Sequence, residues 1–438
     1  MLQGSELKSV SGVSIDSRSL KSKDAFIAIK GDRFDGHRFI PQAVRKKVSA
    51  VVVSKDNGRV PKRIPVVLVA DTTKALGLLA RYHRDRFAIP VIAITGSAGK
   101  TTTKEMVARV LEQRYRVLKN IATQNNHIGV PMTLLKLEKS HEAVVVELGT
   151  NHFGEIAWLT RIANPTIAVM TNIGESHLEF LGSLSGVFKE KLNIANAMKH
   201  RGTVVFNNDD SFLRRIPGKV VHHRLISFGI NQKSRFRATG INFKNSSLRF
   251  RIKTRKGFEL NTPAKHNVYN ALAAICCGDL LNVKPREMQK ALRDFRFPKG
   301  RQQVQMVGKL RIIDDSYNAN PMSLRSAIET LNNLDVVGRK VLVCADMLEL
   351  GAQSKKLHRQ IGDLVARSCV DMLITVGNLS KNINQAARKR KSLEAHHHPT
   401  LASCCRRIKH YLKPKDTVLI KGSRAMKMDR LVETLKEA

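Results

Sequence analysis

Short apolar runs alternate with amphipathic segments through the middle of this 438-residue chain. The apolar runs at residues 91–95, 143–147 and 167–171 are typical of strands that are buried on both faces of a parallel sheet. A helix-compatible segment at residues 105–115 follows the first of them. We therefore predict a central α/β domain and place it at residues 88–299.

The chain before this region has shorter elements. Its apolar runs predict strands at residues 25–29, 50–53 and 66–69. Turns rich in Gly and Asp separate these runs, and helical patterns cover residues 39–47 and 75–87. We predict that residues 1–87 form a separate, small α/β domain.

Two further regions complete the predicted architecture. Residues 203–260 are rich in polar and β-type residues, so we expect antiparallel strands attached to the central domain, and then a helix at residues 267–281. A second alternating series predicts strands at residues 310–315, 340–344, 372–376 and 417–420. This series favours a C-terminal Rossmann-like α/β domain at residues 300–438. We expect the internal run His396-His397-His398 to lie in a loop and not to bind metal.

The charge and the aromatic content of the chain indicate which kinds of partner it binds. The chain has 76 Lys and Arg residues against 36 Asp and Glu residues, which gives a formal net charge of +40. The basic residues are spread along the chain and only 5% of the residues are aromatic, so we do not expect a specific nucleic-acid partner. The charge does favour acidic substrates such as ATP and nucleotide-linked sugars.

The sequence also indicates a cellular compartment. Its six Cys residues include no Cys-x-x-Cys pair, no apolar run reaches membrane-spanning length, and the N-terminus has no signal pattern. We therefore expect a cytoplasmic enzyme with reduced thiols and without membrane insertion.

The segment Gly96-Ser97-Ala98-Gly99-Lys100-Thr101 joins the strand at residues 91–95 to a helix. Backbone N–H groups of such a turn and of a helix N-terminus form a cradle for phosphate oxygens. Lys100 would neutralise the terminal phosphates, and Thr101 would hold a Mg²⁺ ion. The alternative is a plain glycine turn, which would not need the Lys-Thr pair. The predicted ATP-binding residues of this segment are Thr95, Gly96, Ser97, Ala98, Gly99, Lys100, Thr101 and Thr102.

Polar side chains follow two of the predicted central strands. Glu147 ends the strand at residues 143–147, and His177 comes after the strand at residues 167–171. Ligands bind at this edge of open α/β sheets, so both side chains are candidate Mg²⁺ ligands. The alternatives are a helix N-cap or a buried ion pair for Glu147 and a structural role for His177.

Three further segments carry candidate chemistry. Lys191 belongs to a helix that we expect to begin at Lys189, and its spacing alone indicates an amphipathic-helix lysine. Asn267 and Asn270 open another predicted helix, where their amides would either bind a heterocycle or cap the helix. Residues 314–321 and 421–424 each follow a strand of the C-terminal domain, which predicts one shared site for a carboxylate or a phosphate.

Taken in order, these segments resemble the Mur ligases, which join an amine to a carboxylate at the expense of ATP. The loop is shorter than the common phosphate loop, which would need Gly where this chain has Ile94, and the shorter form is similar to that of Mur ligases and folylpolyglutamate synthases. The resemblance covers essentially the whole chain and is carried by residues 13–18, 30–37, 96–104, 125–131, 147–156 and 177–179. Residues 314–321, 346–351 and 421–424 resemble the branch that adds a dipeptide. The Asp-Asn-Pro-Arg motif of the diaminopimelate-adding branch is not found.

This resemblance implies an activity. The enzyme would add D-alanyl-D-alanine to UDP-N-acetylmuramoyl-tripeptide through an acyl phosphate, as a step of peptidoglycan precursor synthesis. It would use ATP and two Mg²⁺ ions, would bind the UDP-sugar in the N-terminal domain, and would act as a monomer.

The resemblance also implies roles for individual residues. Lys191 would be carbamylated by CO₂ and would act in catalysis with Lys100 and His177. The family often has Lys-x-Glu-Ile where this chain has Lys191-Leu192-Asn193-Ile194, so the neighbours of the lysine differ. The implied metal ligands are Thr101, Glu147, His177 and carbamylated Lys191, and the implied further ATP contacts are Asn270 near the adenine, Arg301 on the phosphates and Asp315 near the ribose. The implied substrate-binding residues are Ser17, Arg18, Asp35, His37, Asn125, Asn126, Thr150, Asn151, Asn318, Asn320, Lys421, Ser423 and Arg424.

Two alternative functions remain. Another amide ligase with the same core, such as a folylpolyglutamate synthase, would share the loop but lack the UDP-sugar-binding domain. A nucleic-acid-dependent ATPase is suggested only by the net charge of +40.

Overall fold

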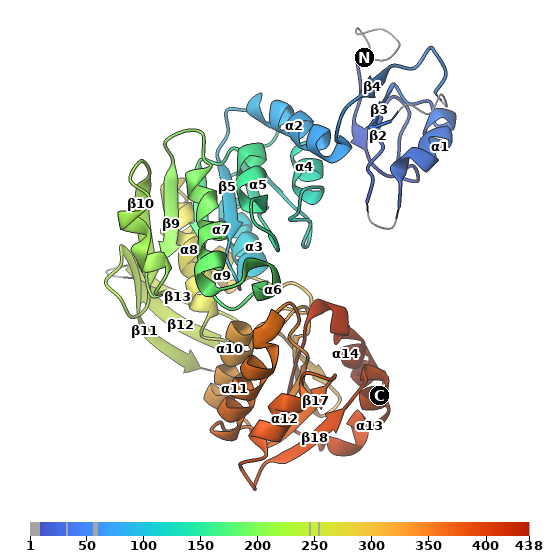
Figure 1. Ribbon diagram of the computed structural model, residues 1–438. Helices are drawn as coiled ribbons and strands as arrows, with labels where there is room; N and C mark the ends of the chain where they lie inside the picture. The colour runs from blue at the N-terminus through green and yellow to red at the C-terminus, as the bar shows by residue number, and fades with distance from the viewer. Residues whose placement is uncertain (1–8, 32–33, 56–59, 245–246, 253–254, 438) are drawn as a thin grey trace.

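The computed structural model describes residues 9–31, 34–55, 60–244, 247–252 and 255–437. Figure 1 shows three α/β bodies that follow one another along the chain. The N-terminal body stands apart and is joined to the rest through α2 (Thr72–Asp85), whereas the central and C-terminal bodies lie against each other. The expected fold class, α/β with parallel sheets and a small antiparallel part, is confirmed.

The N-terminal body is built on a parallel sheet with the strand order β1-β2-β3-β4. Its strands are β1 (Val13–Ser14), β2 (Ala25–Ile27), β3 (Ala50–Val53) and β4 (Val66–Leu68), and its helices are η1 (Gly36–Phe39) and α1 (Ile40–Arg45). Phe26, Ile40 and Val51 are fully buried in its core. The first predicted strand ends early because the backbone turns after Ile27, where the Ile29 N–H donates to the Ile27 carbonyl.

Helix α2 leads from the N-terminal body to the central one. Asp71 caps its first turn by accepting from the N–H groups of Thr73 and Lys74, so the helix begins earlier than the predicted residue 75. Gly77 packs closely against Trp158 of α5 (Glu155–Ala163). The helix therefore packs on the central body although it continues directly from the first sheet.

The central sheet has the strand order β13-β12-β11-β10-β9-β8-β5-β7-β6. Its strands are β5 (Val91–Thr95), β6 (Val117–Lys119), β7 (Ala143–Glu147), β8 (Ile167–Met170), β9 (Thr203–Asn207), β10 (Arg224–Gly229), β11 (Phe236–Lys244), β12 (Ser247–Ile252) and β13 (Arg255–Leu260). The associated helices are α3 (Lys100–Leu111), α4 (Gly129–Leu134), α5, α6 (Leu178–Leu181), α7 (Leu184–Asn196), η2 (Leu213–Gly218), α8 (Asn267–Leu280) and α9 (Pro285–Arg293).

Strand β5 explains why the central runs are apolar throughout. Val91 and Ala93 belong to the core that includes residues of α5 and α7, whereas Ile92 and Ile94 belong to the core that includes residues of α3 and α8. Successive side chains of a strand point to opposite faces, so a strand covered on both faces needs apolar residues at every position.

The prediction for residues 203–260 is partly wrong. Strands β9 and β10 run parallel to β8 and extend the main sheet, and only β11, β12 and β13 pair in antiparallel fashion. A crossover that contains η2 separates β9 from β10, which allows the parallel direction. The β-rich composition of the segment does not indicate whether its strands pair in parallel or in antiparallel fashion.

Two predicted helix boundaries in the central body are also wrong. Helix α3 begins at Lys100 and ends at Leu111, because the left-handed Gly99 (φ 78°) turns the chain directly from the loop into the helix. Helix α7 begins at Leu184, after the N-cap Ser183, so Lys189 and Lys191 lie within it.

The C-terminal body has the strand order β14-β15-β19-β16-β17-β18, in which only β14 is antiparallel to its neighbour. The strands are β14 (Gln303–Val307), β15 (Leu310–Asp315), β16 (Lys340–Ala345), β17 (Met372–Val376), β18 (Glu394–His398) and β19 (Thr417–Lys421). The helices are α10 (Pro321–Asn333), η3 (Gly351–Gln353), α11 (Ser354–Ala366), α12 (Lys381–Ala387), α13 (Leu401–Tyr411), η4 (Arg424–Met426) and α14 (Asp429–Lys436). The predicted strands of this body are confirmed.

The loop predicted for the three consecutive His residues is wrong, because they form part of β18, which pairs with β17. The His396 ring stacks on Tyr411 with a centroid distance of 4.0 Å, so these side chains pack as strand residues. Among the residues that the structure describes, no group of three or more His, Cys, Asp or Glu side chains has metal-binding geometry. No helix in the same part of the chain is long and apolar enough to cross a membrane.

Candidate active site

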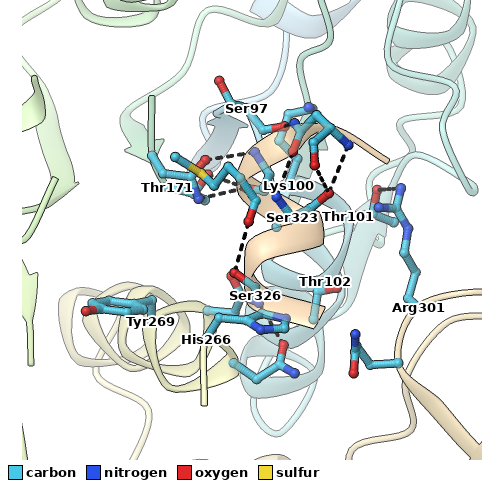
Figure 2. Close-up of a pocket in the computed structure, with 18 of the residues that line it drawn as sticks. Ser97, Lys100, Thr101, Thr102, Thr171, His266, Tyr269, Arg301, Ser323 and Ser326 are labelled. Atoms are coloured by element: carbon cyan, nitrogen blue, oxygen red, sulfur yellow. Dashed lines mark hydrogen bonds between the residues drawn. The ribbon is translucent and has the colours of Figure 1, made fainter. Parts of the chain in front are cut away.

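Two neighbouring cavities lie where the central and C-terminal bodies meet. Lys100, Glu147, Arg301 and Asn318 border both of them. The first cavity, shown in Figure 2, reaches from the loop at Lys100 and Thr101 to His266 and Tyr269 of the α8 segment. The second cavity lies on the other side of Glu147 and is bordered by His177 and by polar residues of the central body. The cavities therefore form one continuous site.

The loop between β5 and α3 has the geometry of a phosphate cradle. Gly96 and Gly99 adopt φ angles of 154° and 78°, and a Cβ atom on Gly96 would clash with Thr171. The Ala98 N–H donates to Asn172 Oδ1 at 2.8 Å, which fixes the middle of the loop. The loop therefore requires both glycines, and the first residues of α3, Lys100, Thr101 and Thr102, border the cavity. The free N–H groups of a helix N-terminus favour anions such as phosphate.

Lys100 is a partly buried cation at the first position of α3. Its Nζ donates to the Gly96 carbonyl at 2.9 Å, which curls the side chain back over the loop. Burial lowers the pKa of Lys100, Arg301 lowers it further, and Glu147 opposes both effects. A ligand with negative charge at this position would therefore be strongly attracted.

Thr101 and Glu147 lie side by side. The Thr101 hydroxyl donates to Glu147 Oε2 at 2.8 Å, and Asn125 Nδ2 donates to Glu147 Oε1 at 2.7 Å. Asn120 holds the Glu147 backbone from both sides, since its Oδ1 accepts from the Glu147 N–H and its Nδ2 donates to the Glu147 carbonyl. Glu147 is therefore neither a helix cap nor part of an ion pair, and its carboxylate is placed against the Thr101 hydroxyl.

His177 connects the two bodies. The residue adopts a left-handed conformation (φ 54°) before α6, and its Nδ1 lies 2.5 Å from Glu349 Oε2 of the C-terminal body. Burial lowers the pKa of His177 and the Glu349 contact opposes this, while the same hydrogen bond lowers the pKa of Glu349. The ring is thus oriented by a carboxylate from the other body.

Lys191 is buried on α7, with 1% of its surface exposed. Within the described residues its amine has no hydrogen-bond or ion-pair partner. Burial and the nearby charge of Lys100 lower the pKa of Lys191 far below the usual value of a lysine, so the amine is held towards its neutral form. The preceding Glu190 accepts from the N–H groups of Gly154 and Ile156, and Asn193 donates to Glu190 rather than to Lys191.

The far end of the first cavity is lined by amides and by a neutral histidine. Asn270 accepts from the Thr103 hydroxyl at 3.0 Å and donates to Asn267 Oδ1 at 2.8 Å, and both amides border the cavity. Burial lowers the pKa of His266 to about 4. Polar groups of this kind suit a heterocyclic base.

Lys421 is not free to bind a substrate on its own. Its Nζ lies 2.5 Å from Asp315 Oδ2 and donates to the Asn318 carbonyl at 3.1 Å. Lys421 and Asp315 both border the first cavity. The structure thus joins the two strand ends that the sequence assigns to one site, and Lys421 lies in it as the partner of Asp315.

The structure brings most of the predicted residues together, but not all. Thr95, Gly96, Lys191, Ser423 and Arg424 do not border either cavity, and neither do Ser17, Arg18, Asp35 and His37 of the N-terminal body. The latter are engaged within their own body, where Ser17 donates to Gln42 and Asp35 lies 2.6 Å from His37 Nδ1. Asn320 borders the first cavity, and Asn125, Asn126, Thr150 and Asn151 border the second.

The structure adds residues that the sequence reasoning did not single out. Glu349 orients His177, and the Arg301 guanidinium lies 4.1 Å from the Tyr317 ring centroid. Tyr317 also donates its hydroxyl to Thr123 across the two bodies. Glu349 and Tyr317 lie within residues 346–351 and 314–321, which resemble segments of Mur ligases. This resemblance is the sequence signal that points to the two residues. The His177 partner of Glu349 and the Thr123 partner of Tyr317 lie 172 and 194 residues away, so spacing gives no guidance on these two contacts.

Comparisons with known proteins agree with this geometry. The chain matches the family models for the Mur ligase family catalytic domain at residues 9–84, the Mur ligase middle domain at residues 94–278 and the Mur ligase glutamate ligase domain at residues 300–424. Proteins named UDP-N-acetylmuramoyl-tripeptide–D-alanyl-D-alanine ligase are similar to it. The one from Bacillus subtilis is 35% identical (98% of this chain, 94% of the relative), and the one from Escherichia coli is 34% identical (100% and 96%).

Solved structures give the same result. A crystal structure of MurF from Acinetobacter baumannii has a TM-score of 0.89 at 34% identity and covers 98% of this chain and 94% of its own. MurF ligase from Thermotoga maritima in complex with ADP has a TM-score of 0.87 at 27% identity, with 97% of each chain covered. The chain belongs to the Mur ligase family.

Proposed function

We propose that this protein is an ATP-dependent ligase that joins D-alanyl-D-alanine to UDP-N-acetylmuramoyl-tripeptide in peptidoglycan precursor synthesis. The relatives that match along the whole chain carry this activity in their names. The observation that carries the proposal is the phosphate loop with Lys100 and Thr101 against Glu147, in a site that the C-terminal body closes.

The reaction would proceed through an acyl phosphate. The terminal carboxylate of the tripeptide attacks the γ-phosphorus of ATP, the bond to ADP breaks, and a carbon–oxygen–phosphorus linkage forms. The amine of D-alanyl-D-alanine then attacks the carbonyl carbon and inorganic phosphate leaves with one carboxylate oxygen. The first step brings two anions together, and the cations Lys100 and Arg301, which border both cavities, would offset that repulsion.

The residues beside the loop fit a divalent cation. The Thr101 hydroxyl and the Glu147 carboxylate are oxygen donors within hydrogen-bond distance of each other, which is the donor chemistry that Mg²⁺ prefers. His177 and carbamylated Lys191 would hold a second ion. When bound, such ions neutralise the phosphate charge and orient the γ-phosphate.

Lys191 would serve as a ligand only after modification, because an ammonium group cannot bind a cation. Its neutral amine is the form that attacks CO₂, and the product is a carbamate with a negative charge in place of the lysine cation. No described residue hydrogen-bonds or pairs with the amine, which supports this proposal. Burial of a charged lysine without a partner is energetically costly. A carbamate that binds a cation would offset this cost.

Each substrate would meet a different part of the chain. We place ATP in the first cavity, with its adenine near Asn270 and its ribose near Asp315, and the tripeptide in the second cavity beside Asn125, Asn126, Thr150 and Asn151. The N-terminal domain, residues 1–87, would bind the UDP-sugar through Ser17, Arg18, Asp35 and His37, and would swing towards the other bodies. Asn318, Asn320, Ser423 and Arg424 would receive the dipeptide together with Lys421. Because ATP and UDP-sugars are made in the cytoplasm, we place the enzyme there, and we propose that it acts as a monomer.

Phosphate release tests this proposal. The protein is incubated with ATP, Mg²⁺ and UDP-N-acetylmuramoyl-tripeptide, with and without D-alanyl-D-alanine, and Lys100→Ala serves as the inactive control. Release that requires both substrates supports the ligase. Release with a folate and glutamate instead would favour the folylpolyglutamate synthase type, and release that depends on added nucleic acid would favour an ATPase of the second type.

A further inference from the structure

The beginning of helix α10 is one part of the C-terminal body that reaches the phosphate-loop region; Arg301, which donates to the Thr101 hydroxyl at 3.3 Å, is another. Asn320, its N-cap, donates through Nδ2 to the Ser97 carbonyl at 3.2 Å. The Met322 side chain packs directly against Gly174, where an added Cβ atom would come within 2.4 Å of Met322 Cε. Arg325 Nη2 lies 2.5 Å from both carboxylate oxygens of Glu175. Three residues of one helix thus contact the central body within two turns.

The segment contacted by α10 is the one that supports the phosphate loop. Thr171, just after β8, donates its hydroxyl to the Ala98 carbonyl at 2.7 Å. The Gly174 N–H donates to Ser97 Oγ at 2.9 Å. Glu175 follows in the same segment, residues 171–176, and is bound by Arg325. A displacement of α10 would therefore act on the support of the phosphate loop.

Helix α10 is also a wall of the first cavity. Asn320, Met322, Ser323 and Ser326 border that cavity, and Figure 2 shows Ser323 and Ser326 facing the side on which Lys100 and His266 lie. Arg325 does not border the cavity, so its side chain has no place in the contact with nucleotide. The Arg325 side chain is 40% exposed and its partner Glu175 is 17% exposed, so water screens the ion pair on the side of the arginine only.

We propose that the Arg325–Glu175 ion pair is a latch between the two bodies, which holds α10 on residues 171–176 and so keeps the nucleotide cavity closed. Arg325 is a positioning residue in this account. The inference rests on the proposed function for its kinetic consequence, whereas its consequence for nucleotide binding is independent of the substrates.

If the ion pair holds α10 in place, substitutions of Arg325 should change nucleotide affinity and turnover. Without the charge on Arg325, α10 loses its ion pair with the central body, so the closed cavity is less populated and ADP binds about tenfold more weakly. Turnover falls by a similar factor, while the KM for UDP-N-acetylmuramoyl-tripeptide changes less than twofold because that substrate does not contact α10. Arg325→Lys keeps a cation in reach and retains most of the affinity.

Calorimetric titration of the full-length protein with ADP and Mg²⁺ tests the latch. The variants are Arg325→Ala, Glu175→Gln and the double variant, with Arg325→Lys as the conservative change. Arg249→Ala is the matched control, because Arg249 pairs with Glu259 inside the β12–β13 hairpin, away from the cavities. Thermal unfolding of each variant verifies that it is folded.

The two residues act as one unit if the latch exists. The double variant then binds ADP as weakly as either single variant, and no more weakly. A dissociation constant of Arg325→Ala within twofold of the wild-type value, or losses that multiply in the double variant, would overturn the proposal. Absence of ligase activity in the wild-type protein would contradict the proposed function instead, and the ADP titration would still decide on the latch.

Discussion

The Thr101 hydroxyl donates a 2.8 Å hydrogen bond to Glu147 Oε2, although 46 residues separate the two along the chain. They meet because β5 and β7 are neighbouring parallel strands whose carboxyl ends lie at one edge of the sheet. Thr101 stands at the start of the helix that follows β5, and Glu147 is the last residue of β7. At this edge of the sheet, two motifs that are distant in the sequence therefore form one site with several oxygen donors.

Thr101→Val tests this site through its dependence on Mg²⁺. The variant keeps the shape of the side chain but loses the hydroxyl, so we expect the Mg²⁺ concentration for half-maximal activity to rise about tenfold. A titration of activity with Mg²⁺ at saturating ATP measures the change. Thr133→Val is the control, since this buried hydroxyl bonds only the Gly129 carbonyl within α4. An unchanged requirement in Thr101→Val would contradict the assignment.

Lys100→Ala separates catalysis from stability. Turnover should fall by at least about a thousandfold because the cation that faces the phosphates is lost. The free energy of unfolding should stay within about 1 kcal/mol of the wild-type value, since burial of the Lys100 charge is itself costly, as the lowered pKa of the side chain indicates. Phosphate release and urea unfolding measure the two quantities. An active variant would show that Lys100 has another role.

Lys191→Ala tests the proposed carbamate. The variant should be nearly inactive, and acetate or another short carboxylate in excess should partly restore turnover by replacing the lost carboxylate. Lys189→Ala is the control, because Lys189 is exposed on the same helix. Full activity of Lys191→Ala in buffer without carboxylate would rule out the proposed role.

Protonation of His266 should account for part of the loss of folding stability at acidic pH. Its pKa is about 4 in the folded protein against 6.5 for an ordinary histidine, mainly because of burial. The unfolded chain therefore binds a proton on His266 before the folded chain does, and stability that is complete above pH 6.5 is lost as the pH falls towards 4. Between pH 7.5 and pH 5 this should remove about 1–2 kcal/mol.

Urea unfolding at both pH values measures this effect. In His266→Gln the corresponding loss should disappear, while the losses from other titrating groups remain. Equal losses in the wild-type protein and the variant would show that His266 protonates as easily in the folded state as in the unfolded one.

The sequence predicts the fold well where elements are buried on both faces. The runs that became β5, β7 and β8 could be located because a strand between two helical layers must be apolar at every position. The direction of β9 and β10 could not be predicted, since it depends on how the chain crosses between them and not on the residues of the strands. The strand of His396, His397 and His398 was missed because its side chains are polar and its stability comes from pairing with β17.

Some residues of the site could likewise be predicted from the sequence, whereas others could not. Lys100, Thr101 and Glu147 follow from local rules, because a phosphate loop and a strand end can each be recognised from their own residues. The partner of His177 could not be derived in this manner. Glu349 lies in another body of the molecule, and only the packing of the two bodies brings its carboxylate to the imidazole. The contact between Lys421 and Asp315 also could not be derived from spacing, because it depends on the pairing of β15 with β19 inside the C-terminal sheet.

The most direct test of the account uses UDP-N-acetylmuramoyl-tripeptide with oxygen-18 in both oxygens of its terminal carboxylate. After reaction with ATP, Mg²⁺ and D-alanyl-D-alanine, mass spectrometry measures both the nucleotide-linked peptide and the inorganic phosphate. The account predicts a product with the mass of the tripeptide plus the dipeptide minus water, with one labelled oxygen retained in the new amide and the other transferred to phosphate. Hydrolysis of ATP without this product, or a product whose formation leaves the phosphate unlabelled, would contradict it.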